Sequence, residues 1–202
     1  MRISPGLALI AGSQFGLAGP LDCSVYALRG PDGMVMIDSG AGTHTAMLLA
    51  NLREDLGDVP LRAVVLTHCH PDHAAGAALV QKQTGCRVLA PELSAAIVEA
   101  ADEEASGLAF ARAAGVYPAD FRLTPCHVDQ PFLDGDCFNA AGSDMAGYRA
   151  DLHKLGGLEI EGLFPGHGLF TLRGGQAHID CAIQQAQQGF LARQIGQGDL
   201  IF

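Results

Sequence analysis

Three histidines and one aspartate lie within residues 68–73, which read His-Cys-His-Pro-Asp-His. His68 and His70 are two positions apart, so in an extended segment their side chains project to the same side. Neutral imidazole and carboxylate groups together are the ligands of Zn²⁺, Fe²⁺ or Mn²⁺ in catalytic sites. Packing alone gives no reason to gather these residue types, so His68, His70, Asp72 and His73 are predicted metal ligands.

The elements around this segment place it at the end of a buried strand. Residues 61–67 form a near-continuous apolar run, which is typical of a strand buried on both faces. The carboxyl end of such a strand is where open α/β sheets bind ligands. A helix is predicted from about residue 72 to residue 84, where Gly85 ends it. Asp72 and His73 therefore lie on the turn into this helix and can face a second, adjacent metal centre.

The rest of the chain alternates between short apolar strands and helical patterns. Strands are predicted at residues 7–11, 24–29, 34–38, 87–90 and near 158–164, with a hairpin turn at residues 31–33. Helices are predicted at residues 43–56, from residue 91 onward, at 144–155 and at 176–193. This order indicates an α/β chain whose first half runs ββ(β)αβαβα, and one domain is predicted over residues 1–202.

Composition excludes several classes of partner. The chain has 202 residues, 49% of them hydrophobic, as in a globular protein. Its 12 basic and 22 acidic residues give a net charge of −10, which argues against nucleic acid or an anionic membrane as a partner.

None of the six cysteines is in a C-x-x-C pair, and Cys69 alternates away from the histidines, so packing roles are predicted. No secretory signal or long apolar span is visible, and a cytoplasmic protein is expected.

The histidine-rich segment resembles the metallo-β-lactamase superfamily of metallohydrolases, in particular its glyoxalase II-like and lactonase-like branches. Two further stretches are similar to that family: residues 36–40, which contain Asp38, and residues 164–168, which contain His167. The resemblance implies an α/β/β/α sandwich with the site at one edge, between the two sheets. It also implies that Asp38 supports the metal-binding loop through hydrogen bonds.

A two-metal site is typical of this family. By resemblance, His68 and His70 serve the first metal together with a third histidine from the middle of the chain, and an aspartate bridges both metals. The second metal takes Asp72, His73 and His167, and Asp72 is also the predicted catalytic residue. The implied reaction is hydrolysis of a small ester-like molecule, a thioester or a lactone, by a metal-bound hydroxide. Zinc is the expected metal, with one or two ions bound, and iron or manganese suits the same ligands.

The middle of the chain departs from the family pattern. Residues 128–136 resemble the stretch before the usual ligand-bearing hairpin and residues 139–144 the stretch after it, so the chain jumps across near 137–141. This interpretation predicts impaired or single-metal binding and loss of part of the second sheet. Such a loss would expose apolar surface or a sheet edge, which a second copy of the chain could cover. A homodimer is therefore a further hypothesis.

An alternative keeps the missing ligands. Residues 124–127 mimic a T-P-G-H loop, which would make His127 the third histidine and Asp136 the bridging aspartate. Against this, the eight residues between them are too few for two strands and a turn. On the opposing interpretation, His127 is a surface histidine and residues 134–136 are a plain turn.

Two other functions stay open at this point. Some family members hold one iron and oxidise a persulfide, which bound iron and oxygen consumption would indicate. The second is a binding protein that keeps the fold but has lost catalysis and binds a ligand or partner. Protein without metal and without turnover would indicate it. A true β-lactamase is less expected without a secretion signal, and a nucleic-acid-processing enzyme is disfavoured by the negative charge.

Overall fold

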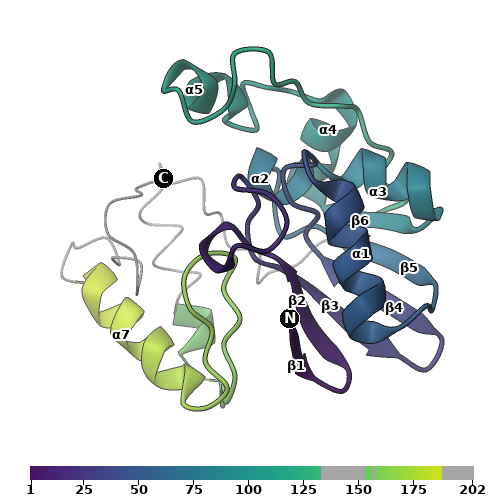
Figure 1. The fold of residues 1–202 in the computed structure, drawn as a ribbon. Helices are drawn as coiled ribbons and strands as arrows, with labels where there is room; N and C mark the ends of the chain where they lie inside the picture. The colour runs from purple at the N-terminus through teal and green to yellow at the C-terminus, as the bar shows by residue number, and fades with distance from the viewer. Residues whose placement is uncertain (133–152, 157, 188–202) are drawn as a thin grey trace. The chain divides into compact units, whose positions relative to one another are not determined.

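The computed structural model describes residues 1–132, 153–156 and 158–187 (Figure 1). The chain divides into two compact units, Met1–Leu133 and Asp134–Phe202. The single domain predicted over residues 1–202 stays a prediction. The mid-chain jump near residues 137–141, and with it any loss from a second sheet, lies outside the described residues.

The first unit is built on one seven-stranded mixed sheet whose strands follow chain order from β1 to β7. The strands are β1 (Arg2–Ser4), β2 (Leu7–Ala11), β3 (Val25–Gly30), β4 (Gly33–Ile37), β5 (Leu61–Val65), β6 (Arg87–Pro91) and β7 (Gln130–Phe132). Strands β1 to β4 pair antiparallel, and β4 to β7 pair parallel. The predicted α/β class is confirmed, because the parallel pairs are joined by crossovers that contain helices.

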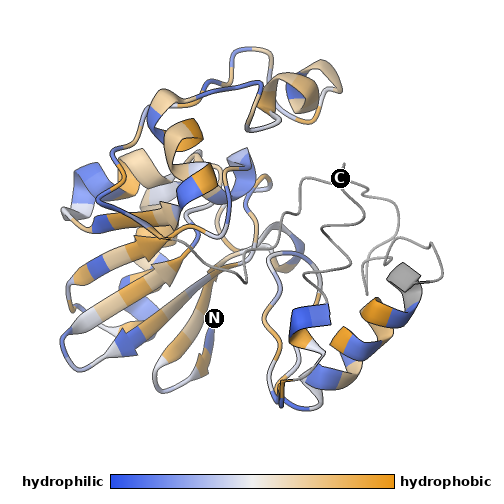
Figure 2. Ribbon diagram, turned by 180° about the vertical axis from the view of Figure 1, so that it is seen from behind, coloured by the Kyte–Doolittle hydropathy of each residue, from blue (hydrophilic) through white to orange (hydrophobic). Residues whose placement is uncertain are grey.

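Four helices of the first unit, α1 to α4, bury apolar side chains in one core with the sheet. The helices of this unit are α1 (Thr45–Leu56), α2 (Pro71–Ala74), α3 (Ala77–Thr84), α4 (Glu92–Ala100) and α5 (Leu108–Ala113), with a short 3-10 turn, η1, at Ser13–Phe15. Leucines of α1 recur at helical spacing and are almost fully buried in the same core cluster as Val80 of α3 and Val98 of α4. Figure 2 shows the matching hydrophobic runs along the strands.

The two faces of the central strands are buried to different degrees. Met34 and Met36 of β4 and Val64 of β5 are at most 1% exposed and join the helical core. Their neighbours Val35 and Val65, which point to the other face, are only half-buried. The prediction that residues 61–67 are buried on both faces is therefore confirmed for one face and holds in part for the other.

The helix predicted over residues 72–84 is two helices, α2 and α3, separated at Ala75 and Gly76. The loop after β4 causes the break, because it packs directly against the chain at this point. The Gly76 amide donates to the Gly40 carbonyl at 2.9 Å, and the Ser39 amide donates to the His73 carbonyl at 2.7 Å. A Cβ atom on Gly76 would lie 2.2 Å from the Ser39 carbonyl oxygen, so only glycine fits. This contact ties the loop after Asp38 to the histidine-rich segment.

Substitution of Gly76 by alanine is expected to lower the free energy of unfolding by about 3 kcal/mol, the upper end of the range for overpacking, because the obstructing atom belongs to the backbone. Gly30→Ala is the matched control, since its Cβ would lie 3.7 Å from the nearest atom. Urea denaturation of both variants measures the difference. Equal unfolding midpoints for Gly76→Ala and the unaltered protein would contradict the close packing of the two loops.

The described part of the second unit contains α7 (Gly175–Gln187), which confirms the closing helix over those residues. The strand predicted near residues 158–164 is wrong: only an isolated bridge joins Leu163 to Thr171. Its backbone groups find partners elsewhere, because the Gly175 amide donates to the Glu161 carbonyl at 2.8 Å. The helix predicted at residues 144–155 lies mostly outside the described residues.

Candidate metal centre

The carboxyl end of β5 brings three imidazole rings together. The ring centroids of His68 and His70 are 4.5 Å apart, and those of His68 and His73 are 4.1 Å apart. Asp72 joins them, with its Oδ2 atom 3.3 Å from Nε2 of His73. His73 is buried, whereas the other three residues are half-buried. The four ligands predicted within residues 68–73 therefore lie in one cluster.

Pro71 explains how neighbouring residues converge on this point. A residue before proline favours extended backbone, and His70 has φ −61° and ψ 147°. Proline is well suited to the first helical position, and Pro71 begins α2 there. The chain then turns at once, so that the His73 amide donates to the His70 carbonyl at 3.1 Å. An extended His70 followed by one helical turn places His70 and His73 side by side in space.

Asp38 supports the cluster from the end of the neighbouring strand β4. Its carboxylate is buried and accepts the Thr67 amide at 2.7 Å on Oδ1 and the ring Nδ1 of His73 at 2.8 Å on Oδ2. The Thr67 hydroxyl lies 3.0 Å from Oδ1 and 2.9 Å from Oδ2. Asp38 has φ 62°, a left-handed conformation that is uncommon outside glycine and often marks functional positions. These contacts agree with the supporting role that the resemblance implies for Asp38.

These hydrogen bonds also indicate which nitrogen of the His73 and His68 rings can bind a cation. His73 gives its Nδ1 proton to Asp38, so Nε2 is its metal-binding atom. Thr67 has one hydroxyl proton, and when it donates this to Asp38 its oxygen accepts from Nδ1 of His68, 3.0 Å away. Nε2 is then the metal-binding atom of His68 as well. Thr67 is thus a positioning residue that the sequence reasoning missed.

The charge state of His73 follows from its surroundings. Burial acts to lower the pKa of His73, but Cys23, Asp38 and Asp72 together raise it, so the pKa lies well above the ordinary histidine value. In the metal-free protein the ring is therefore protonated over an extended pH range. A bound cation would take the place of the proton on Nε2.

A pH dependence of stability follows for the metal-free protein. Because the pKa of His73 is raised on folding, its contribution is complete below the unfolded-state pKa of about 6.5 and is lost as the pH rises through the folded-state pKa. The free energy of unfolding of chelator-treated protein is therefore expected to fall on the alkaline side. Urea denaturation from pH 6 upward, compared with His73→Gln, measures this contribution as the difference between the two proteins. Parallel pH curves for the two proteins would contradict it.

Of the remaining predicted ligands, His127 is not part of this cluster. His127 lies on the surface, with 73% of its side chain exposed and Nδ1 3.2 Å from a carboxylate oxygen of Glu99. That position agrees with a surface histidine and gives no support to His127 as the third ligand. Asp136 lies outside the described residues. His167 belongs to the second unit, between two glycines, and its role as a ligand stays a prediction.

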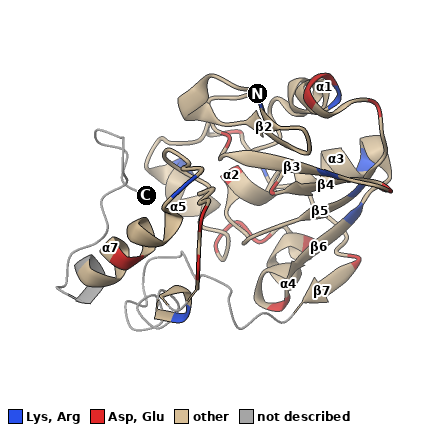
Figure 3. Ribbon diagram, turned by 90° about the horizontal axis from the view of Figure 1, so that it is seen from below, with Lys and Arg blue, Asp and Glu red and all other residues tan. Residues whose placement is uncertain are grey.

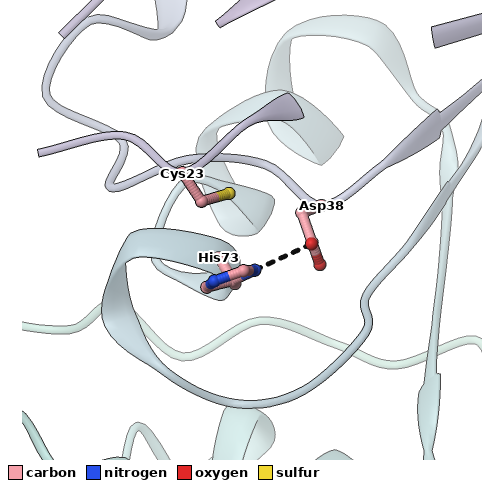
Figure 4. Close-up of side chains that lie close together, drawn as sticks. All are labelled: Cys23, Asp38 and His73. Atoms are coloured by element: carbon pink, nitrogen blue, oxygen red, sulfur yellow. Dashed lines mark hydrogen bonds and ion pairs between the residues drawn. The ribbon is translucent and has the colours of Figure 1, made fainter. Parts of the chain in front are cut away.

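Two further residues near the cluster were missed because they are distant in sequence. The Cys23 side chain is fully buried and lies beside Asp38 and His73 (Figure 4). Tyr117 is buried in a smaller apolar cluster with Leu108, and burial together with the nearby Asp72 carboxylate raises the pKa of its hydroxyl. No sequence spacing connects either residue to residues 68–73.

Comparison with known proteins bears on the family. Residues 18–107, which include Asp38 and the whole histidine cluster, match the model of the metallo-beta-lactamase superfamily. These residues are similar to the metallo-β-lactamase superfamily, and the match covers less than half of the chain. The family predicted from residues 68–73 is thereby confirmed, although the glyoxalase II-like branch is not specified.

Solved structures of metallo-β-lactamases share this fold. A B3 metallo-β-lactamase with an active-site glutamic acid is 17% identical, with a TM-score of 0.64 over 93% of this chain and 86% of that one. The native FEZ-1 metallo-β-lactamase from Legionella gormanii is 14% identical, with a TM-score of 0.60 over 94% and 84%. A metallo-β-lactamase with a HARLDQ motif from Cronobacter sakazakii is 22% identical, with a TM-score of 0.50 over 67% of this chain. The match spans about half, 48%, of that protein's length. At these identities the likeness establishes the fold and not the substrate.

Charge distribution and helix length relate to the predictions about nucleic acid and membranes. Figure 3 shows Lys and Arg on several separate elements of the described chain, among more numerous acidic residues. In the same part of the chain, no helix has the length and apolar character needed to cross a membrane. The cytoplasmic location, the absence of a nucleic-acid partner and the homodimer stay predictions.

Proposed function

We propose that this protein is a zinc-dependent hydrolase of a small ester-like molecule, a thioester or a lactone. The observation that carries the proposal is the cluster of His68, His70, Asp72 and His73, in which Asp38 holds His73 by its Nδ1 atom. The superfamily consists mainly of metal-dependent hydrolases, which supports the reaction class. Thioester and lactone substrates rest on the sequence resemblance to two branches of the family.

The residues of the cluster fit a divalent cation. Imidazole nitrogens and one carboxylate are the donors that zinc, iron or manganese accept in catalytic sites. A bound cation would activate a water molecule and polarise the carbonyl group of a substrate. Asp72 is half-buried, with 24% of its side chain exposed, so its carboxylate can reach both the cation and an incoming water molecule. Asp38 and Thr67 keep the rings of His73 and His68 oriented and so reduce the reorganisation needed during reaction.

One metal ion at this cluster is the proposed stoichiometry. Within the described part of the first unit, His68, His70, Asp72 and His73 lie in one cluster, and His127 lies apart with Glu99. On the interpretation that the chain jumps across near residues 137–141, the usual mid-chain histidine and bridging aspartate are missing. Asp72 and His73 supply the core of the retained site, and His167 is the proposed third ligand.

The experiment combines metal analysis with a substrate panel. The protein is purified without added metal or chelator, its zinc, iron and manganese contents are measured, and hydrolysis of thioesters, lactones, β-lactams and phosphodiesters is assayed. About one equivalent of zinc with chelator-sensitive thioester or lactone turnover supports the proposal. Two full equivalents held by nitrogen and oxygen donors alone would overturn the proposal of one metal ion at this cluster. Metal-loaded protein inactive on every ester, or iron-loaded protein that consumes oxygen with a persulfide, would overturn the hydrolase.

A further inference from the structure

A second set of possible metal donors shares His73 with the histidine cluster. Cys23, Asp38 and His73 come from three separate segments, and one donor atom from each lies within 4.8 Å of the other two. All three residues are buried, with exposed fractions of 0%, 2% and 4%. Figure 4 shows the Cys23 sulfur directed toward the space beside the Asp38 carboxylate and the His73 ring. Sulfur, oxygen and nitrogen donors therefore meet at one interior point.

Backbone hydrogen bonds fix these three segments against one another. The Cys23 amide donates to the Asp72 carbonyl at 3.3 Å, which ties the sulfur-bearing segment to α2. The amide and hydroxyl of Ser39 both donate to the His73 carbonyl, at 2.7 and 2.8 Å. Because Asp38 precedes Ser39, the carboxylate and imidazole are fixed to each other twice, through side chains and through backbone. The three donors are thus held close together before any cation arrives.

We propose that Cys23, Asp38 and His73 form a buried site for a thiophilic divalent cation such as Zn²⁺, Cd²⁺ or Co²⁺, distinct from the cluster of His68, His70 and Asp72. A thiolate favours soft or borderline cations over magnesium or calcium. One thiolate, one carboxylate and a neutral imidazole balance the charge of a divalent cation, which a buried position requires. Zinc lies about 2.0–2.3 Å from such donors, so donor atoms already within 4.8 Å of one another need only a small rearrangement to bind it.

His73 belongs to both sets, through opposite sides of its ring. Nδ1 faces Asp38 at 2.8 Å, and Nε2 faces Asp72 at 3.3 Å. The buried site does not require the proposed hydrolase, because Cys23 and Asp38 play no part in binding substrate. A cation held between Cys23 and Asp38 would take the hydrogen-bonded position that now supports the outer cluster.

Titration of the chelator-treated protein with Co²⁺ tests the site. A thiolate ligand gives a sulfur-to-cobalt charge-transfer band in the near ultraviolet, whereas nitrogen and oxygen ligands give only the visible d–d bands. The charge-transfer band is expected in the unaltered protein and should disappear in Cys23→Ser. Cys69→Ser and Cys126→Ser are the controls and should retain it, because Cys69 lies between two histidines and Cys126 is equally buried in the core.

A measurement on the unaltered protein makes the test independent of how Cys23→Ser folds. Cadmium-113 NMR of Cd²⁺-loaded protein distinguishes a thiolate-bound ion from one bound only by nitrogen and oxygen. A thiolate-type resonance supports the buried site. Its absence, or a cobalt charge-transfer band that survives in Cys23→Ser, overturns it. If d–d bands are present without charge transfer, the buried site fails while the outer cluster and the proposed hydrolase stand.

Discussion

Asp72→Asn is expected to weaken zinc binding at least about 100-fold and to reduce ester hydrolysis to near background. Mutation of a residue that only supports a metal ligand lowers metal affinity or activity ~10–100-fold, and loss of a ligand itself should cost at least as much as the upper end of that range. Asparagine keeps the shape of the side chain but removes the carboxylate that lies 3.3 Å from Nε2 of His73. The remaining donors of the cluster are imidazoles, which do not offset the charge of a divalent cation. Competitive titration with a zinc-binding dye and steady-state kinetics measure the two effects.

The control for this substitution is Asp58→Asn. The Asp58 side chain is 97% exposed and its nearest cation, on Arg53, is 4.0 Å away, so the same chemical change should leave zinc affinity and turnover unaltered. His68→Ala provides the comparison within the cluster. If Asp72→Asn retained full zinc affinity while His68→Ala lost it, the metal would be held mainly by the first pair of histidines. That outcome would contradict the assignment of the retained site to Asp72 and His73.

The histidine cluster could be predicted from sequence because its parts are local. His68, His70, Asp72 and His73 lie on one short turn, and the apolar run before them marks a strand whose carboxyl end is the expected site. Asp38 was found only through the resemblance to a family. Its bond to His73 spans 35 positions of the chain, and no local pattern indicates such a contact.

Long-range contacts account for what sequence patterns could not predict. The break between α2 and α3 depends on Gly76 meeting the loop after β4, which the continuous helical pattern does not reveal. Strand β7 has only three residues and is held by pairing with β6, so it lacks a periodic signal of its own. Cys23 had been assigned to simple packing along with the other cysteines. Its position beside Asp38 follows from the pairing of β3 with β4, which becomes visible only in the fold.

Asp38→Asn is expected to lower the free energy of unfolding of the metal-free protein by about 3–5 kcal/mol, as when one partner of a buried ion pair is removed. The Asp38 and His73 side chains are only 3% and 5% exposed, so His73 would keep a buried positive charge without its main counter-charge. Zinc affinity should fall roughly 10–100-fold as well, because the His73 ring loses the acceptor that orients it. Urea denaturation with chelator present and zinc titration measure the two effects separately.

Asp22→Asn separates a specific loss of metal support from general loss of stability. Asp22 is as buried as Asp38, but its carboxylate accepts the backbone amides of Gly19 and Ala41, at 2.6 and 2.8 Å, and not a histidine of the cluster. Burial is the main cause that raises the pKa of Asp22. The neutral amide of asparagine should therefore be tolerated better at position 22 than at position 38. Asp22→Asn should therefore reduce stability less than Asp38→Asn and leave zinc affinity unaltered. Equal losses of zinc affinity in both variants would mean that Asp38 acts through the stability of the loops and not through the orientation of His73.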